Sequence, residues 1–189
     1  DGYVETLLVG NSYNKDIWDP DINFSSELFC LDHQGNTKWK FLLSDFWFAV
    51  QSTPVVCDLE GDGQLEILIG GETSSSWFDS QGKFYCLDAN GGVKWVQNYT
   101  SFYSYYSPAV GDLNNDNKLE IVFSTWSQVI CLDYQGEILW SATGSFFADF
   151  GFSPTIADLY NDGNYEVVVE SWRGLYCFQG DPSDKVDDG

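Results

Sequence analysis

Hydrophobic residues along this chain fall into short runs that alternate with segments rich in Asp, Asn, Gly and Ser. Residues 108–113, 119–124, 128–133 and 137–141 are four such runs in immediate succession. Their lengths suit β-strands, and no segment has sustained helical periodicity. Short strands separated by evenly spaced turn signals predict an antiparallel all-β fold.

These four runs form a unit that recurs along the chain. Residues 107–113 (SPAVGDL) align with residues 153–159 (SPTIADL) and 53–59 (TPVVCDL), at offsets of 46 and 54 residues. The same period separates Cys30, Cys86, Cys131 and Cys177, and also Trp39, Trp95 and Trp140. A period of about 45 to 55 residues is typical of propeller blades. Each unit is therefore predicted to be a four-stranded β-propeller blade, with tight hairpins at 33–35, 89–91 and 134–136.

The repeats divide the chain into one propeller segment of about three and a half blades. The expected boundaries are 1–52 (partial), 53–106, 107–152 and 153–189 (partial). Propellers typically close with four to eight blades, so the segment is expected to belong to a larger or multi-chain assembly. The last residues, 186–189 (VDDG), placed before Asp1 and Gly2, nearly rebuild an acidic turn. Head-to-tail assembly, excision from a longer array and chance are all compatible with this match.

An acidic turn follows the first predicted strand in three of the units. Residues 58–66 (DLEGDGQLE), 112–120 (DLNNDNKLE) and 158–166 (DLYNDGNYE) share an acid at positions one, five and nine. Calcium takes six to eight oxygen ligands, and alternate residues of a tight loop can aim their oxygens at one point. Carboxylates this close would repel one another without a cation. The alternative is an ordinary Asp/Asn/Gly turn, but three turns in register favour calcium over that alternative, and over magnesium.

The predicted calcium ligands follow from these positions. They are Asp58, Glu60, Asp62, Gln64 and Glu66 in the first turn, Asp112, Asn114, Asp116, Lys118 and Glu120 in the second, and Asp158, Asp162, Asn164 and Glu166 in the third. Gln64, Lys118 and Asn164 would contribute backbone carbonyls. Asp1 and Glu5 match the back half of such a turn and would form half a site. Position six requires a positive φ, which Gly63, Asn117 and Gly163 can adopt.

The acidic turns and their flanking strands resemble a known family. The run SPAVGDLN at 107–114, followed by LEIV at 119–122, resembles the FG-GAP repeat of integrin-α-type propellers. The strand FYCLD at 84–88, with Gly92 and Trp95, resembles a quinoprotein-type (PQQ-like) blade. The resemblance covers nearly the whole chain. It implies structural calcium ions that pin the turn between the first two strands, in a family whose members serve adhesion, ligand binding or polysaccharide cleavage.

The charge of the chain limits the partners it can bind, and its cysteines indicate which positions are buried. With 29 acidic and 8 basic residues the formal net charge is −21, so we expect no nucleic-acid partner and an attraction for cations. No apolar run is long enough for a membrane-spanning helix. The five cysteines lie in predicted strands without any CxxC pair, so each is expected to be a small, buried, free thiol.

Aromatic residues make up 17% of the chain and crowd the connections on the side opposite the acidic turns. Candidate ligand-binding residues are Trp18, Trp47, Trp77, Tyr103, Tyr105, Trp126 and Trp172. Exposed aromatic rings near Asp, Asn and Gln are typical of a sugar-binding face, although the same rings could wedge between blades as core. Asn23 and Asn98 begin N-glycosylation sequons.

Catalytic signals are few, since His33 is the only His and Arg173 the only Arg. We predict no catalytic residues and a non-catalytic, calcium-stabilised module, extracellular or at the cell surface, where calcium is millimolar. Its partner would be a glycan, a protein ligand or copies of itself in a surface layer or filament. The alternative is a scaffold fragment of a carbohydrate-active enzyme, similar to a polysaccharide lyase.

Overall fold

The computed structural model describes residues 4–13, 24–44, 50, 52–72, 81–100, 106–125, 127–143 and 152–180. All regular structure in these ranges is β-strand, which confirms the predicted all-β fold. No helix long and apolar enough to cross a membrane occurs in these ranges.

Within the described ranges, four antiparallel sheets, named A to D here, follow one another along the chain. Sheet A holds β1 (Thr6–Tyr13), β2 (Phe24–Leu31) and β3 (Thr37–Ser44); sheet B holds β4 (Val55–Cys57), β5 (Glu66–Glu72), β6 (Gln81–Asp88) and β7 (Val93–Thr100). Sheet C holds β8 (Ala109–Gly111), β9 (Glu120–Ser124), β10 (Gln128–Leu132) and β11 (Ile138–Thr143); sheet D holds β12 (Thr155–Ala157), β13 (Glu166–Ser171) and β14 (Gly174–Gln179). Two four-stranded and two three-stranded sheets agree with the predicted three and a half blades.

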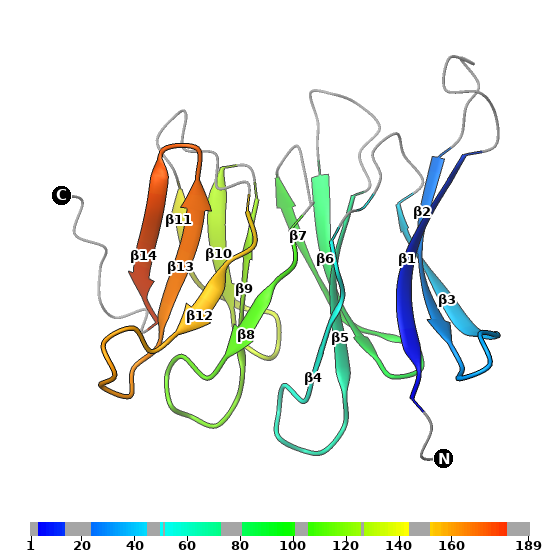
Figure 1. Ribbon diagram of the computed structural model, residues 1–189, viewed down its shortest axis with the longest axis horizontal. Coiled ribbons are helices and arrows are strands. Elements are labelled where there is room, and N and C mark those ends of the chain that lie inside the picture. Colours follow the sequence, from blue (N-terminus) through cyan, green and yellow to red (C-terminus); the bar gives the residue numbers. More distant parts are fainter. Residues whose placement is uncertain are drawn as a thin grey trace.

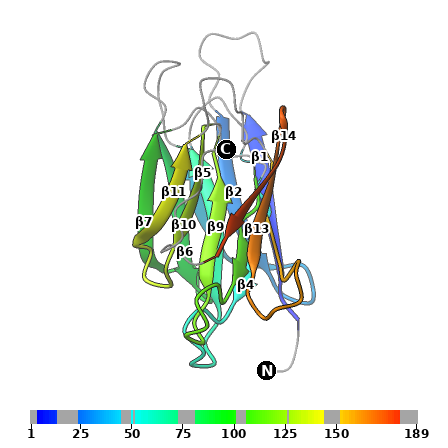
Figure 2. The same ribbon diagram turned by 90° about the vertical axis from the view of Figure 1, so that its left-hand side faces the viewer.

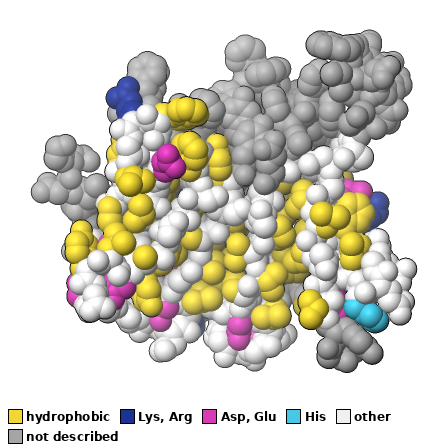
Figure 3. Space-filling model, in the orientation of Figure 1, with side chains coloured by type: hydrophobic (Ala, Val, Ile, Leu, Met, Phe, Trp, Pro, Cys, Tyr) yellow, Lys and Arg dark blue, Asp and Glu magenta, His cyan; other side chains and the backbone are white. Residues whose placement is uncertain are grey.

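The sheets stand side by side as propeller blades, from sheet A at the N-terminal end to sheet D at the C-terminal end (Figure 1). Within each sheet the strands are hydrogen-bonded in their order along the chain. The acidic turns of sheets B, C and D all lie at one end of the strands, and Figure 2 shows the same grouping from the side. In the space-filling view, Asp and Glu side chains lie mainly along this end, whereas apolar side chains spread across the face above it (Figure 3).

Each tight hairpin between the third and fourth strand of a blade is built around an aspartate. The carboxylate of Asp88, the last residue of β6, accepts the backbone N–H of Asn90 at 2.7 Å and of Gly92 at 3.0 Å. Asp32 and Asp133 accept the equivalent bonds in sheets A and C. The turn requires a positive φ, and Gly91 adopts it at 82°. The hairpins predicted at 33–35, 89–91 and 134–136 are therefore confirmed.

Among the residues that the structure describes, apolar side chains are buried in three clusters, one at each boundary between neighbouring sheets. Successive side chains of a strand point to opposite faces, so one strand serves two boundaries. In β5, Ile67 and Ile69 belong to the cluster shared with sheet A, while Leu68 belongs to the cluster shared with sheet C. At the second boundary, Phe84 stacks on Phe123 with ring centroids 4.5 Å apart. The blades are thus held together mainly by face-to-face burial of apolar surface.

Polar contacts also join each blade to the next. Trp39 Nε1 donates to the backbone oxygen of Ala89 at 3.1 Å, and Trp95 Nε1 donates to that of Tyr134 at 3.1 Å. In the third copy of this position, Trp140 Nε1 is buried without a hydrogen-bond partner among the described residues. The regular spacing of these tryptophans in the sequence therefore reflects a contact between blades that recurs at two of the three boundaries.

The cysteine prediction is only partly correct. All five cysteines are free, and Cys30, Cys86 and Cys131 are buried as expected. Cys57 is half-buried, and Cys177 is exposed, so its predicted burial is wrong. Cys86 and Cys131 pack into the clusters shared with the following sheet. Cys177 lies on β14 of sheet D, and no further sheet follows in the part of the chain that the structure describes.

Candidate metal-binding turns

The first position of each acidic turn organises the loop through both of its carboxylate oxygens. Asp58 Oδ1 accepts the backbone N–H of Asp62 at 3.0 Å, and its Oδ2 accepts that of Gly63 at 2.8 Å. Asp112 and Asp158 accept the same pair of bonds at 2.9 to 3.1 Å. These backbone donors, that of Gly63 foremost, lower the pKa of the Asp58 carboxyl below its usual value.

Positions five and six complete the loop. Asp62 Oδ1 accepts the N–H of Gln64 at 2.8 Å, and Asp116 and Asp162 make the equivalent bonds to Lys118 and Asn164. Position six has a positive φ in every turn, as the sequence predicted: 84° at Gly63, 65° at Asn117 and 89° at Gly163. The three turns therefore share one backbone conformation and one set of internal hydrogen bonds.

The closing glutamate at position nine lies beneath the turn. Glu66, Glu120 and Glu166 begin β5, β9 and β13, and they are only 1%, 2% and 2% exposed. The Oε2 atom of each accepts the backbone N–H of the leucine at position two, at 3.0, 2.7 and 2.9 Å. Each glutamate thus ties the start of the second strand to the end of the first.

The second oxygen of this glutamate has different partners in sheets B and C. Lys94 Nζ lies 2.8 Å from Glu66 Oε1 and 3.3 Å from Glu60 Oε2. Hydrogen bonding to Glu66 raises the pKa of Lys94. In sheet C, Asn114 Nδ2 donates to Glu120 Oε1 at 3.1 Å, and burial raises the pKa of the Glu120 carboxyl. The predicted half-site residue Glu5 is likewise paired with a lysine, Lys38, at 2.7 Å.

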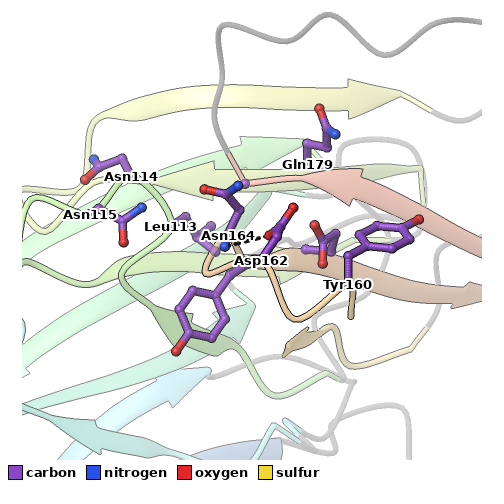
Figure 4. A pocket seen from close by; sticks show the side chains of 10 residues that line it. Leu113, Asn114, Asn115, Tyr160, Asp162, Asn164 and Gln179 are labelled. Atoms are coloured by element: carbon purple, nitrogen blue, oxygen red, sulfur yellow. Dashed lines mark hydrogen bonds between the residues drawn. The ribbon is translucent and has the colours of Figure 1, made fainter. Parts of the chain in front are cut away.

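The third turn borders a cavity of about 300 Å³ between sheets C and D (Figure 4). Its walls are Leu113, Asn114 and Asn115 from the second acidic turn, Tyr160, Asp162, Asn164, Tyr165 and Glu166 from the third, and Gln179 and Gly180 at the end of sheet D. Two carboxylates and four side-chain amides line it, without a Lys or Arg. The cavity is therefore suited to a positively charged or hydrogen-bonding group.

The fit of these turns to calcium can be judged from their oxygens. In the part of the chain that the structure describes, no group of three or more His, Cys, Asp or Glu side chains is placed to hold a metal ion. A carboxylate offers about four lone-pair sites, so the aspartates at positions one and five keep acceptor capacity beyond their N–H bonds. Glu66 and Glu120 would have to exchange Lys94 or Asn114 for a metal ion. The aspartates thus fit a calcium loop better than the glutamates do, and the ligand sets stay predictions.

The other predicted site residues are only partly covered by the described ranges. Trp172 lies in the turn between β13 and β14, away from the acidic turns, and is 75% exposed. Its ring is 6.0 Å from that of Phe152, which is 6.1 Å from that of Tyr106. Asn98 is exposed on β7. Asp1, Trp18, Asn23, Trp47, Trp77, Tyr103, Tyr105 and Trp126 lie outside the described residues.

Sequence reasoning missed the lysine partners of the glutamates. It assigned Lys118 a backbone carbonyl role, whereas the structure also places its Nζ 3.8 Å above the ring of Tyr134. Lys94 was not predicted to be part of the site, although its repeat spacing in the sequence indicates a shared role with Lys38. Lys38 and Lys94 each follow the strand cysteine of their repeat by eight residues.

Comparison with known proteins supports the repeat assignment. Residues 58–123 match the model of the FG-GAP-like repeat, which confirms the FG-GAP resemblance over the first and second acidic turns. No curated protein sequence matches the chain. The quinoprotein-like character of the strands stays a resemblance.

Solved structures include two proteins that are similar to this chain. The crystal structure of the V. cholerae biofilm matrix protein Bap1 shares 20% identity at a TM-score of 0.49, covering 92% of this chain and 30% of that one. A Bacteroides caccae protein of unknown function shares 15% identity at a TM-score of 0.39, covering 78% and 48%. The chain thus spans less than half the length of either protein.

Proposed function

Because residues 58–123 carry an FG-GAP-like repeat, we propose that this chain is an extracellular, calcium-stabilised propeller module that binds or assembles and has no catalytic activity of its own. The observation that carries the proposal is the common architecture of the three acidic turns. They share the same aspartate-centred hydrogen bonds and lie at one end of three adjacent blades.

Calcium bound in these turns would stabilise the pairing of the first two strands of each blade. The first strands of sheets B, C and D, namely β4, β8 and β12, are three residues long. Each forms only three residue pairs with the strand that follows it. An ion held between the turn aspartates would fix the two strands to each other and offset the repulsion of their carboxylates. Weak loops of this kind are filled where calcium is millimolar, which places the proposed role outside the cell.

Calorimetric titration with calcium tests this proposal. Each turn that binds should contribute to the stoichiometry, and magnesium should give a weaker signal because it prefers a rigid octahedron. The matched variants are Asp62→Asn, Asp116→Asn and Asp162→Asn, which keep the Oδ1 acceptor for the N–H of position seven and remove one charge. Each is expected to remove one site. An unchanged titration in the triple variant would refute the role of the turns.

We further propose that the opposite end of the blades makes the contact with a glycan or protein ligand. Trp172 supports this, because its indole is 75% exposed and lies beside further aromatic rings, an arrangement suited to stacking on a sugar or an apolar ligand group. Its neighbours Phe152 and Tyr106 extend the aromatic surface across sheets D and C. Trp172→Ala should weaken binding to immobilised acidic and neutral polysaccharides at least tenfold if the ring is a sugar platform. An exposed apolar residue at the other end, Leu65, is the control for lost apolar surface.

A further inference from the structure

The described boundaries between neighbouring blades join two different faces of a sheet. The forward face of a sheet is the one that packs on the following sheet, and the rear face is the one that packs on the preceding sheet. Between sheets B and C, Phe84 and Cys86 lie on the forward face, and Phe123 and Ile130 lie on the rear face. Phe84 stacks on Phe123, and the two rings are only 1% and 3% exposed. The third strand of one sheet is thus buried against the second strand of the next.

Sheet D has a forward face that no described sheet covers. Cys177 is the strand cysteine of its repeat, as Cys86 is in sheet B, and both pair with an apolar residue of the second strand. Leu175, two residues before Cys177, therefore occupies the position of Phe84. Leu175 is 75% exposed, and Cys177 is exposed as well. Positions that are buried in sheet B are open to solvent in sheet D.

Sheet A has a rear face that is uncovered in the same way. Leu8 pairs with Phe29 across β1 and β2, as Phe123 pairs with Ile130 in sheet C. Leu8 therefore occupies the position of Phe123, and it is 52% exposed. Sheets A and D are the two ends of the row of blades (Figure 1). The row thus exposes a rear face at one end and a forward face at the other.

These two open faces are the two halves of a blade boundary. Leu175 and Leu8 occupy the positions of the Phe84–Phe123 stack, so bringing the two leucines together would repeat the contact between sheets B and C. Burying them would remove apolar surface from water, which is what holds the internal boundaries together. Two copies of four sheets make eight, and closed propellers typically have four to eight blades.

We propose that the forward face of sheet D binds the rear face of sheet A of a second copy of this chain, and that two copies close into one ring. The contact is head-to-tail, and a ring of two copies uses it twice. This inference rests on the proposed function, because it names the partner of a module that assembles. It does not depend on calcium in the acidic turns, since the contact is made by apolar strand residues.

Sedimentation velocity of the full chain over a range of concentrations tests the proposal. In millimolar calcium the 21.3 kDa chain should convert to a species of twice that mass as its concentration rises. The net charge of −21 on each copy opposes association, so added salt should strengthen the dimer by screening this repulsion. A chain that stays monomeric up to about 0.1 mM would overturn the proposal. Open-ended growth into longer polymers would overturn the closed ring.

Two charge variants identify the faces. Leu175→Asp and Leu8→Lys each place a charge in the contact and should raise the dissociation constant of the dimer at least about a hundredfold. Both side chains are exposed in the single chain, so both variants should fold. An equimolar mixture should recover the dimer, because it forms one unsubstituted contact and one in which the new carboxylate meets the new ammonium. A mixture that stays monomeric, or a single variant that still dimerises, would contradict the head-to-tail contact.

Ile138 provides the matched control. It is 52% exposed, as Leu8 is, but it lies on β11, the fourth strand of sheet C. Ile138→Asp and Ile138→Lys should leave the dissociation constant within about twofold of the unsubstituted chain. Loss of the dimer in these controls would show that added charge alone prevents association, and it would overturn the assignment of the faces.

Labelling of Cys177 gives a second readout of the same contact. In the dilute, monomeric chain Cys177 is open to a maleimide. Its labelling rate should fall at least about tenfold at concentrations that form the dimer, because the thiol becomes inaccessible there. Leu8→Lys, which changes only the opposite face, should abolish this fall. A labelling rate that does not depend on concentration would contradict the proposal.

The failure of this proposal can be told apart from the failure of the calcium assignment. A monomeric chain whose melting temperature rises with calcium would overturn the contact between copies and leave the calcium module intact. A chain that dimerises equally in calcium and in chelator, with no change in melting temperature, would support the contact and refute the calcium assignment.

Discussion

The indole Nε1 of Trp95 donates a hydrogen bond to the backbone oxygen of Tyr134 at 3.1 Å, across the boundary between sheets B and C. The ring also lies against Gly136, where an added Cβ would come within 2.7 Å of it. Gly136 is thus required twice, for its φ of 86° and for the approach of the ring. Trp39 makes the same contacts with Ala89 and Gly91 one boundary earlier.

Replacing this indole by a benzene ring isolates the hydrogen bond. Trp95→Phe should destabilise the chain by about 1 kcal/mol beyond the loss of ring area, because the bond to Tyr134 is lost. Denaturant unfolding measures the change. Trp140→Phe is the matched control, since the buried Nε1 of Trp140 has no partner among the described residues. Equal losses in the two variants would show that the bond contributes nothing.

The turn glycines allow a test of backbone conformation alone. A Cβ at Gly63 would meet nothing within 4 Å, so Gly63→Ala should cost only the strain of its φ of 84°, about 1 kcal/mol. Gly63→Asn should cost less, because Asn117 adopts a φ of 65° at the same position of the second turn. Thermal unfolding with chelator present measures both. If Asn is as costly as Ala, the positive φ is not what this position selects.

The ion pair between Lys94 and Glu66 of sheet B can be introduced into sheet C by substituting Leu139. Leu139→Lys should bring an ammonium to Glu120, as Lys94 is brought to Glu66, and stabilise the chain by about 0.5–1 kcal/mol at neutral pH. Burial raises the pKa of the Glu120 carboxyl in the folded chain. The contribution of Glu120 to the free energy of unfolding is therefore most favourable at low pH, where the carboxyl is protonated, and it is lost as the pH rises through the folded-state pKa.

The gain from Leu139→Lys should therefore grow as the pH rises through the range in which Glu120 ionises, and vanish in acid. The control Leu139→Gln has no charge and should show no such pH dependence. Parallel curves of melting temperature against pH for the two variants would contradict this account.

Thiol reactivity tests the burial pattern of the blades. Cys177 is exposed and should react first with a maleimide, whereas Cys86 and Cys131 are fully buried. Burial also raises the pKa of Cys86 to about 12, which leaves almost no thiolate at neutral pH. Peptide mass spectrometry over a time course gives the order. Early labelling of Cys86 in the native protein would be inconsistent with the packing of sheets B and C.

The sequence predicted the elements that depend on local chemistry. The hairpins follow from an aspartate and a glycine three residues later, as at Asp88 and Gly91, and the acidic turns follow from residues within nine positions. The Lys94–Glu66 pair spans 28 residues and needs the register of β5, β6 and β7, which local patterns do not contain. The exposure of Cys177 likewise depends on what covers sheet D, so its repeat position alone was misleading.

Thermal unfolding in millimolar calcium and in excess chelator tests the central claim most directly. Calcium that binds only the folded chain at about 100 times its dissociation constant adds about 2.7 kcal/mol per site, which corresponds to a rise in Tm of roughly 5–10 °C for a chain of this size. The account predicts this rise in the unsubstituted chain and its loss when Asp62, Asp116 and Asp162 are all changed to Asn. An identical Tm with calcium and with chelator would mean that the turns are held by their own hydrogen bonds and that the calcium assignment is wrong.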